Sequence, residues 1–257
     1  MVFTDLDGTL IDHDTYDWSA ANPALEALRR VSAGLVLASS KTAAEMARLR
    51  TKIGAERWPA IVENGAGILP PFATKITECG EYGAVRSALN NLPADLRDLF
   101  CGFGDMRTAQ VAQMTGLSKD EAALAQKRDF SEPGRWSGTP SQKDAFLAAL
   151  AKNGLSAQEG GRFLTLSFGR NKVDQMRSLI SVYKPRYTIA LGDAPNDIAM
   201  LENADIGIIV ANPARPPLPP LRSETSGRIV RTTEAGPKGW NLAVLDAIDR
   251  FDLKKGN

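Results

Sequence analysis

The stretch "MVFTDLDGTL", residues 1–10, decides the fold, because it joins a short apolar run to two aspartates and a glycine. The run predicts a buried strand, and Asp5 and Asp7 stand where that strand ends. Side chains two residues apart on a strand point to the same face, so the two carboxylates lie on one side if the strand is still regular there. Gly8 then allows the backbone to turn sharply. Acids at the end of a buried strand indicate a functional site.

The bulk composition narrows the class of protein. The chain has 257 residues, 43% hydrophobic and 24% charged, with a net charge of +1, which is typical of a soluble globular protein. It has no basic stripe for nucleic acid, and no apolar run near the ~20 residues of a membrane span. The two cysteines form no CxxC pair, and acids arrive too early for a signal peptide. We therefore expect a cytoplasmic protein without nucleic-acid or membrane partners.

The first third of the chain alternates strands and helices. After residues 1–6 we predict a helix over Asn22–Val31 with an asparagine cap, a strand over Gly34–Ser40, and a helix that stops at Gly54. A third strand is expected over Pro59–Leu69, with an Asn-Gly turn after it. This order predicts a parallel sheet with helices on both faces.

The same rhythm returns near residue 172. Helices are expected over 172–183, 195–204 and 239–251, and strands over 187–193, 206–212 and 227–232, with an irregular proline-rich loop at 213–222. Between the two parts lie helical patterns at 84–93, 118–128 and 141–154 and a candidate strand at 161–168. The chain therefore predicts a doubly wound, Rossmann-like α/β core of residues 1–75 and 168–257, with an inserted α/β domain at 76–167.

Polar residues collect at the predicted carboxyl ends of the core strands, where open parallel sheets bind their ligands. Asp5 and Asp7 follow the first strand, Ser39 and Ser40 end the second, and Asp193 ends a later one, followed by Asn196 and Asp197; Lys172 opens a core helix. Close like charges are costly without a cation. Carboxylates with a substrate phosphate describe a Mg²⁺ site, and a carboxylate can act as the nucleophile in phosphoryl transfer.

"DLDGTL", a serine after the second strand, a lysine and "GDAPND" resemble the four motifs of the haloacid dehalogenase-like phosphatases. The resemblance implies that Asp5 is the nucleophile and Asp7 the general acid and base. It implies Mg²⁺ ligands and an orienting amide, a phosphate site, and a cation that neutralises the phosphate. The metal would be held by Asp5, the Asp7 carbonyl, Asp193 and Asp197, with Asn196 as the orienting amide. The phosphate would be bound by Ser39 or Ser40 and by amides of the Asp5–Thr9 loop, such as that of Leu6. The neutralising cation would be Lys172.

Within that superfamily the chain is similar to the mannosyl-3-phosphoglycerate phosphatases, through "SSKTAAEM", "ENGAGI", "GFGDM", "GGRF" and "GPKGWN". The similarity implies that residues 76–167 form a cap of the second, α/β type (C2) that selects the substrate. The cap residues expected to read the substrate are Asp105, Glu132, Lys143, Gly161 and Arg162. Two positions depart from the family pattern: Ser131 replaces an acid, and Asn171-Lys172-Val173 replaces "DKG".

Other interpretations remain open. A glucosyl analogue or another phosphorylated polyol is an alternative substrate, and a hexose-phosphate phosphatase or phosphomutase an alternative activity. A third alternative is a non-catalytic module that binds a nucleotide or phosphate. The sequence argues against it, because no GxGxxG motif follows the first strand. Arg170 competes with Lys172, and Asp197 could serve only to cap a helix. His13 is interpreted as structural or solvent-facing, since Asp7 fills the acid-base role. The sequence does not indicate an oligomeric state.

Overall fold

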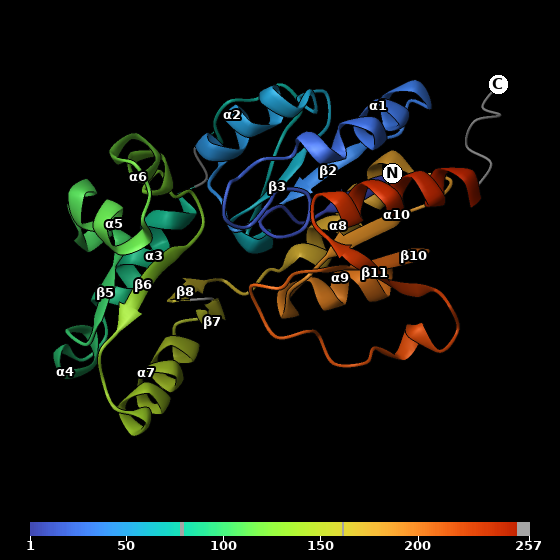
Figure 1. Cartoon of the computed structure of the whole chain (residues 1–257). Coiled ribbons are helices and arrows are strands. Elements are labelled where there is room, and N and C mark those ends of the chain that lie inside the picture. The colour runs from blue at the N-terminus through green and yellow to red at the C-terminus, as the bar shows by residue number, and fades with distance from the viewer. Residues whose placement is uncertain (78–79, 161, 251–257) are drawn as a thin grey trace. The chain divides into compact units, whose positions relative to one another are not determined.

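The computed structural model describes residues 1–77, 80–160 and 162–250. The candidate substrate residue Gly161, and Phe251 at the end of the last predicted helix, lie outside this part of the chain. The chain divides into two compact units (Figure 1). Unit 1 comprises residues 1–39, 57–61 and 172–257, and unit 2 comprises residues 40–56 and 62–171. The predicted insertion at 76–167 falls within the second range, and its role as a cap stays a prediction.

A seven-stranded sheet runs in the order β11-β10-β9-β1-β2-β3-β4, and β11 to β3 pair in parallel. Its strands are β1 Val2–Thr4, β2 Leu35–Ala38, β3 Ala60–Val62, β4 Gly67–Leu69, β9 Ile189–Gly192, β10 Ile206–Ala211 and β11 Ile229–Ala235. The strands β1, β2, β3 and β9 are buried along their whole length, which explains their continuous apolar runs.

Helices connect the strands of this sheet, and the connections run along the sheet in two opposite directions. These helices are α1 Asn22–Arg30, α8 Lys172–Tyr183, α9 Ile198–Asn203 and α10 Lys238–Arg250. The helix α2 Ala43–Ile53 follows β2 in the chain and belongs to unit 2. The connection from β1 through α1 to β2 moves away from β9, whereas the connection from β9 through α9 to β10 moves the opposite way. Right-handed crossovers in opposite directions place their helices on opposite faces of the sheet. The predicted doubly wound core is confirmed, and the winding reverses between β1 and β9.

The helix ends show one correct and one wrong prediction. Gly54 ends α2 in the left-handed conformation with φ 76°, as expected, and Thr42 begins α2 with a capping box. Asn22 is not a cap: it is the first residue of α1 and Ala21 precedes it. A short 3₁₀ turn at Ser19–Ala21 runs directly into the helix and leaves no extended cap position. The Asn241 side chain of α10 instead accepts the Ala24 N–H at 2.9 Å.

The single strand expected over Pro59–Leu69 is wrong, because the segment forms β3, a turn and β4. Glu63 and Asn64 both have positive φ, at 51° and 59°, and a residue in that region cannot continue a strand. The buried Glu63 carboxylate accepts the N–H groups of Asp129 and Phe130. These contacts explain why the turn lies inside the segment.

Unit 2 contains a four-stranded antiparallel sheet in the order β5-β6-β8-β7, so the predicted α/β insertion is confirmed as a mixed fold. Its strands are β5 Phe100–Gly102, β6 Glu132–Trp136, β7 Ser156–Gly160 and β8 Phe163–Ser167. Its other helices are α3 Glu81–Asn90, α4 Ala94–Arg97, α5 Thr108–Thr115, α6 Lys119–Ala125 and α7 Pro140–Lys152. Val85, Phe100, Phe146 and Leu166 form the centre of one apolar cluster that joins this sheet to its helices.

The proline-rich segment 212–221 has no regular structure, as predicted, and ends in a 3₁₀ turn at Arg222–Glu224. None of the helices in the described ranges combines the length and apolar character that crossing a membrane requires.

Candidate active site

The loop after β1 places Asp5 at the point where the winding of the sheet reverses. Its backbone N–H donates to Leu191 O of β9 at 2.9 Å, so Asp5 still pairs as a strand residue. The chain then turns at Gly8, where φ is +86°. A Cβ at Gly8 would lie 2.1 Å from Asn212 Nδ2, so both the conformation and the close approach require glycine. The sharp turn predicted after "DLD" is confirmed.

Three carboxylates meet at the ends of β1 and β9. Asp5, Asp193 and Asp197 each offer one oxygen, and these oxygens all lie within 4.8 Å of one another. Asp193 and Asp197 are buried, whereas Asp5 is partly exposed. A cluster of this charge needs cations close by, because burial removes the water that would otherwise screen it.

Lys172, the first residue of α8, supplies one such cation. Its Nζ donates to Asp5 Oδ1 at 2.5 Å and to Asp197 Oδ1 at 2.7 Å, and the residue is only 1% exposed. Lys172 therefore contacts the carboxylates. Arg170, the alternative candidate for the cation at this site, pairs instead with Glu81 of unit 2. A buried lysine held between two acids is fixed in position by both of them.

Burial strongly affects the titration of this pair. The loss of water raises the pKa of the Asp5 carboxyl to about 8, although the nearby Lys172 ammonium acts in the opposite direction. Burial alone would lower the pKa of Lys172, but Asp197 and Asp5 outweigh it and raise that pKa above its ordinary value. The ammonium is therefore the charged partner that the cluster retains at neutral pH.

Both oxygens of the Asp197 carboxylate accept hydrogen bonds. Its Oδ2 accepts the N–H groups of Asp193 and Ala194 at 3.1 and 3.0 Å, while Oδ1 accepts from Lys172. Gly192 makes this loop possible, since a Cβ there would lie 2.4 Å from the Asp197 Cβ. Asp197 thus orients both the lysine and the Asp193 backbone.

Asp193 has three partners that sequence reasoning missed. Thr9 Oγ1 donates to Oδ1 at 2.7 Å, Asn212 Nδ2 donates to Oδ2 at 2.8 Å, and Arg215 Nε lies 3.1 Å from Oδ2. The strand-end rule could have found Asn212, which follows β10 beside β9. Nothing in the proline-rich pattern pointed to Arg215.

The other predicted core residues lie close to these strand ends in the sequence. Ser39 follows β2 and is buried, and its N–H donates to Ile61 O at 3.0 Å, whereas Ser40 is exposed. Leu6 is buried, and Asp7 forms a backbone bridge with Ile11. Asn196 lies half-buried in the 3₁₀ turn Pro195–Asp197. The roles expected for these residues stay predictions.

The donor set fits a divalent cation such as Mg²⁺. Carboxylate oxygens are hard ligands, and three of them converge within one ion's reach. The Asp5 side chain is 13% exposed, whereas those of Asp193 and Asp197 are 1% and 0% exposed. All three carboxylates also accept hydrogen bonds from the chain: Asp5 from Lys172, Asp193 from Thr9 and Asn212, and Asp197 from Lys172 and two backbone N–H groups.

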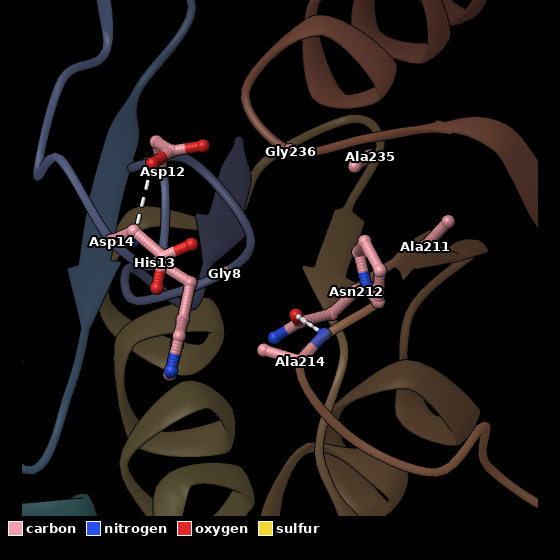
Figure 2. Close-up of a pocket in the computed structure, with 10 residues that line it drawn as sticks. Gly8, Asp12, His13, Asp14, Ala211, Asn212, Ala214, Ala235 and Gly236 are labelled. Carbon is pink, nitrogen blue, oxygen red and sulfur yellow. Dashed lines mark hydrogen bonds between the residues drawn. The ribbon is translucent and has the colours of Figure 1, made fainter.

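A cavity of about 270 Å³ lies beside the loop after β1. Figure 2 shows Asp12, His13 and Asp14 on one side of it, and Asn212 and Ala214 on the other. The Asn212 side chain accepts the Ala214 N–H at 3.0 Å and so shapes the turn on that side. His13 is exposed and lines this cavity, in agreement with its interpretation as solvent-facing.

Two of the predicted substrate residues of unit 2 share one network. Asp105 accepts from Arg86 at 2.5 Å and from Arg97 at 2.8 Å, and Arg86 also lies 3.6 Å from Glu132. Burial would raise the pKa of the Asp105 carboxyl, but these arginines lower it. Burial raises the pKa of Glu132, which accepts from Tyr82 at 2.5 Å.

The other two described candidates lie elsewhere in unit 2. Lys143 of α7 pairs with Glu159 of β7, and Arg162 donates to Thr115 O at 3.1 Å. The structure therefore brings Asp105 and Glu132 together, and gives Lys143 and Arg162 separate partners.

Solved structures share the fold of this chain over nearly its whole length. Sucrose-phosphatase from Synechocystis, solved with sucrose and phosphate, is 17% identical, with a TM-score of 0.62 over 98% of this chain and 97% of that one. A phosphatase of the haloalkanoate superfamily from Bacteroides thetaiotaomicron is 18% identical, with a TM-score of 0.63 over 98% and 94%. The protein TM0651 from Thermotoga maritima is 16% identical, with a TM-score of 0.66 over 95% and 96%. These likenesses define the fold.

A segment of the sequence also matches a known protein family. Residues 147–216 match the family model described as haloacid dehalogenase-like hydrolase. That segment includes Lys172, Asp193 and Asp197, and it continues through Asn212 and Arg215. Over this segment the chain is similar to haloacid dehalogenase-like hydrolases.

Proposed function

We infer that the protein is a Mg²⁺-dependent phosphomonoesterase that uses Asp5 as its nucleophile. The observation that carries this inference is the buried Lys172 ammonium, which bridges Asp5 and Asp197 while Asp193 lies within 4.8 Å of both. A nucleophilic carboxylate, a fixed cation and a metal-binding acid are the groups that in-line phosphoryl transfer requires.

Asp5 attacks the phosphorus of the substrate, and the bond between phosphorus and the ester oxygen of the substrate breaks as the aspartyl phosphate forms. Asp7 donates a proton to the departing oxygen and later takes a proton from the water that hydrolyses the aspartyl phosphate. Lys172 offsets the negative charge on the nucleophile and on the transferring phosphoryl group. Ser39 and the amides of the loop after β1 hold the phosphoryl oxygens, and Ser40 is the alternative donor.

Asp5, Asp193 and the Asp7 carbonyl would hold Mg²⁺, with Asp197 and Asn196 orienting the ligands. The bound ion would supply positive charge to the phosphoryl oxygens and allow Asp5 to stay ionised beside other acids. The residues of the chain fix the position of each reacting group before the substrate arrives.

Mannosyl-3-phosphoglycerate is the substrate that we favour, with mannosylglycerate and phosphate as products. The motifs quoted from unit 2 support this choice, as does the likeness in fold to sugar phosphatases. In unit 2 a carboxylate-rich network around Asp105 and Glu132 suits sugar hydroxyls, and an arginine such as Arg162 suits a glycerate carboxylate. We expect the enzyme to act in the cytoplasm.

A phosphate-release assay on the purified chain tests this function. The panel contains mannosyl- and glucosyl-3-phosphoglycerate and simple hexose phosphates, each with Mg²⁺ and with a chelator. We expect phosphate release that depends on the metal and is fastest with the mannosyl compound. Comparable rates on simple hexose phosphates would contradict the substrate but leave the phosphatase.

The assay also separates the enzyme from a non-catalytic phosphate-binding module. A module would release no phosphate from any compound, and it would bind inorganic phosphate equally well with Asp5→Asn.

A further inference from the structure

Arg215 is a cation at the metal site that the catalytic scheme does not use. Its Nε lies 3.1 Å from Asp193 Oδ2, and the Asp193 side chain is 1% exposed. Arg215 itself is 35% exposed and lies in the irregular segment after β10. A buried acid thus has a charged partner on a loop that reaches solvent.

The charges of the cluster explain why this partner is present. The two buried acids Asp193 and Asp197 outnumber the one buried ammonium, that of Lys172, and Asp5 is a third acid of the same cluster. Arg215 reduces this imbalance without a metal. A divalent cation would balance the three acids together with Lys172 alone, and the charge of Arg215 would then be superfluous.

The neutral partners of Asp193 allow such an exchange. Thr9 holds Oδ1 and Asn212 holds Oδ2, so the carboxylate keeps its orientation when Arg215 moves away. Asn212 is in turn fixed by the Ala214 N–H, in the turn drawn in Figure 2. Two uncharged donors, Thr9 and Asn212, therefore hold the Asp193 carboxylate in place. Arg215 neutralises its charge and is free to move away.

We propose that Arg215 is a tethered counter-cation of the metal site, which neutralises Asp193 in the metal-free protein and competes with the divalent cation for it. This inference rests on the proposed metal-dependent function, and it adds a residue that sets how tightly the metal binds. Removing the charge of Arg215 destabilises the metal-free protein and strengthens metal binding, two effects of opposite sign.

The test compares wild type with Arg215→Gln, which removes the charge, and Arg215→Lys, which keeps it. Arg222→Gln is the matched control, because Arg222 is exposed at the end of the same segment. Each full-length protein is melted without metal and at a series of Mg²⁺ concentrations, and its Kd for Mg²⁺ is measured by calorimetry. Neither readout depends on activity.

For Arg215→Gln we expect a metal-free Tm about 2–4 °C below wild type. Its Kd for Mg²⁺ should be about three- to tenfold tighter, since one positive charge beside a divalent ion is removed. Its Tm gain with Mg²⁺ should accordingly exceed that of wild type. Arg215→Lys and Arg222→Gln should bind Mg²⁺ within about twofold of wild type.

The inference is wrong if Arg215→Gln binds Mg²⁺ no tighter than wild type, or if Arg215→Lys or Arg222→Gln tightens binding as much. These outcomes leave the proposed function intact, because wild type still binds the metal. If wild type and all variants bind no Mg²⁺, both the inference and the metal-dependent function fail.

Discussion

The acidic clusters of the two units are built in different ways. In unit 1 the acids lie directly at the ends of two neighbouring parallel strands, and a fully buried lysine joins two of them. In unit 2 Asp105 and Glu132 come from separate segments and are joined by Arg86, whose side chain is 20% exposed. In unit 1 the order of the strands determines where the acidic side chains lie. In unit 2 the positions of the acidic side chains depend on ion pairs with neighbouring arginines.

The largest expected effect is the loss of activity in Asp5→Asn. The amide keeps the shape of the side chain but cannot attack phosphorus, so phosphate release should fall by about 10³-fold or more. Glu132→Gln is the counterpart in unit 2, and it should change kcat/KM by no more than about 10²-fold. The measurement is phosphate release at saturating and limiting substrate, with melting curves to confirm folding. Equal losses in the two variants would contradict the comparison.

The next effect is on stability. Lys172→Met leaves Asp5 and Asp197 without their shared cation in a buried site, so the free energy of unfolding should fall by about 3–5 kcal/mol. Urea denaturation in the absence of metal measures this difference. Adding Asp5→Asn to Lys172→Met should recover part of the loss, because one uncompensated acid is removed. A strictly additive double variant would show that the two residues do not interact.

Lys143→Met provides the matched loss of a lysine ion pair in unit 2. The Lys143 and Glu159 side chains are 28% and 69% exposed, and water already solvates both groups. Its free energy of unfolding should therefore change by at most about 1 kcal/mol in the same denaturation experiment. A loss as large as that of Lys172→Met would mean that burial does not distinguish the two pairs.

The last prediction is a pH dependence in unit 2. Burial, and then the charge of Glu63, raise the pKa of the Asp129 carboxyl to about 6, from 3.8 in an unfolded chain. The folded protein therefore holds this proton longer, and the contribution of Asp129 to stability is greatest below 3.8 and declines as pH rises to about 6.

Asp129→Asn removes the carboxyl group that titrates in this pH range. Relative to wild type, its free energy of unfolding should increase between pH 3.8 and about 6 and stay constant above that range. Urea denaturation at a series of pH values measures this difference. A difference that does not vary with pH would contradict the raised pKa.

The order of the buried strands along the chain was enough to predict which acidic residues meet at the edge of the sheet. Asp5 and Asp193 could be placed together because each follows a buried apolar strand, and parallel strands end at one edge. The Asn22 cap failed because a short 3₁₀ turn before it leaves no extended position, and Asn241, distant in sequence, supplies the hydrogen bond instead. Tertiary contacts of that kind leave no local signal.

Ser131 shows how the structure explains a departure that the sequence alone could not. Its hydroxyl donates to the buried Glu63 carboxylate at 2.7 Å and accepts from Arg128 at 2.7 Å. An acid at this position would face a second buried carboxylate, so serine fits the partners that surround it. Arg215 was missed for a similar reason, because its role depends on a fold that brings β10 beside β9.

Mass spectrometry of the acid-quenched enzyme tests the central claim most directly. Wild type and Asp7→Asn are mixed with Mg²⁺ and mannosyl-3-phosphoglycerate, quenched, digested and compared with Asp5→Asn. We predict one phosphoryl group on the peptide that contains Asp5, more abundant in Asp7→Asn because the activation of water is impaired. A phosphoryl group on another peptide, or phosphate release by Asp5→Asn at the wild-type rate, would contradict the assignment of Asp5 as the nucleophile.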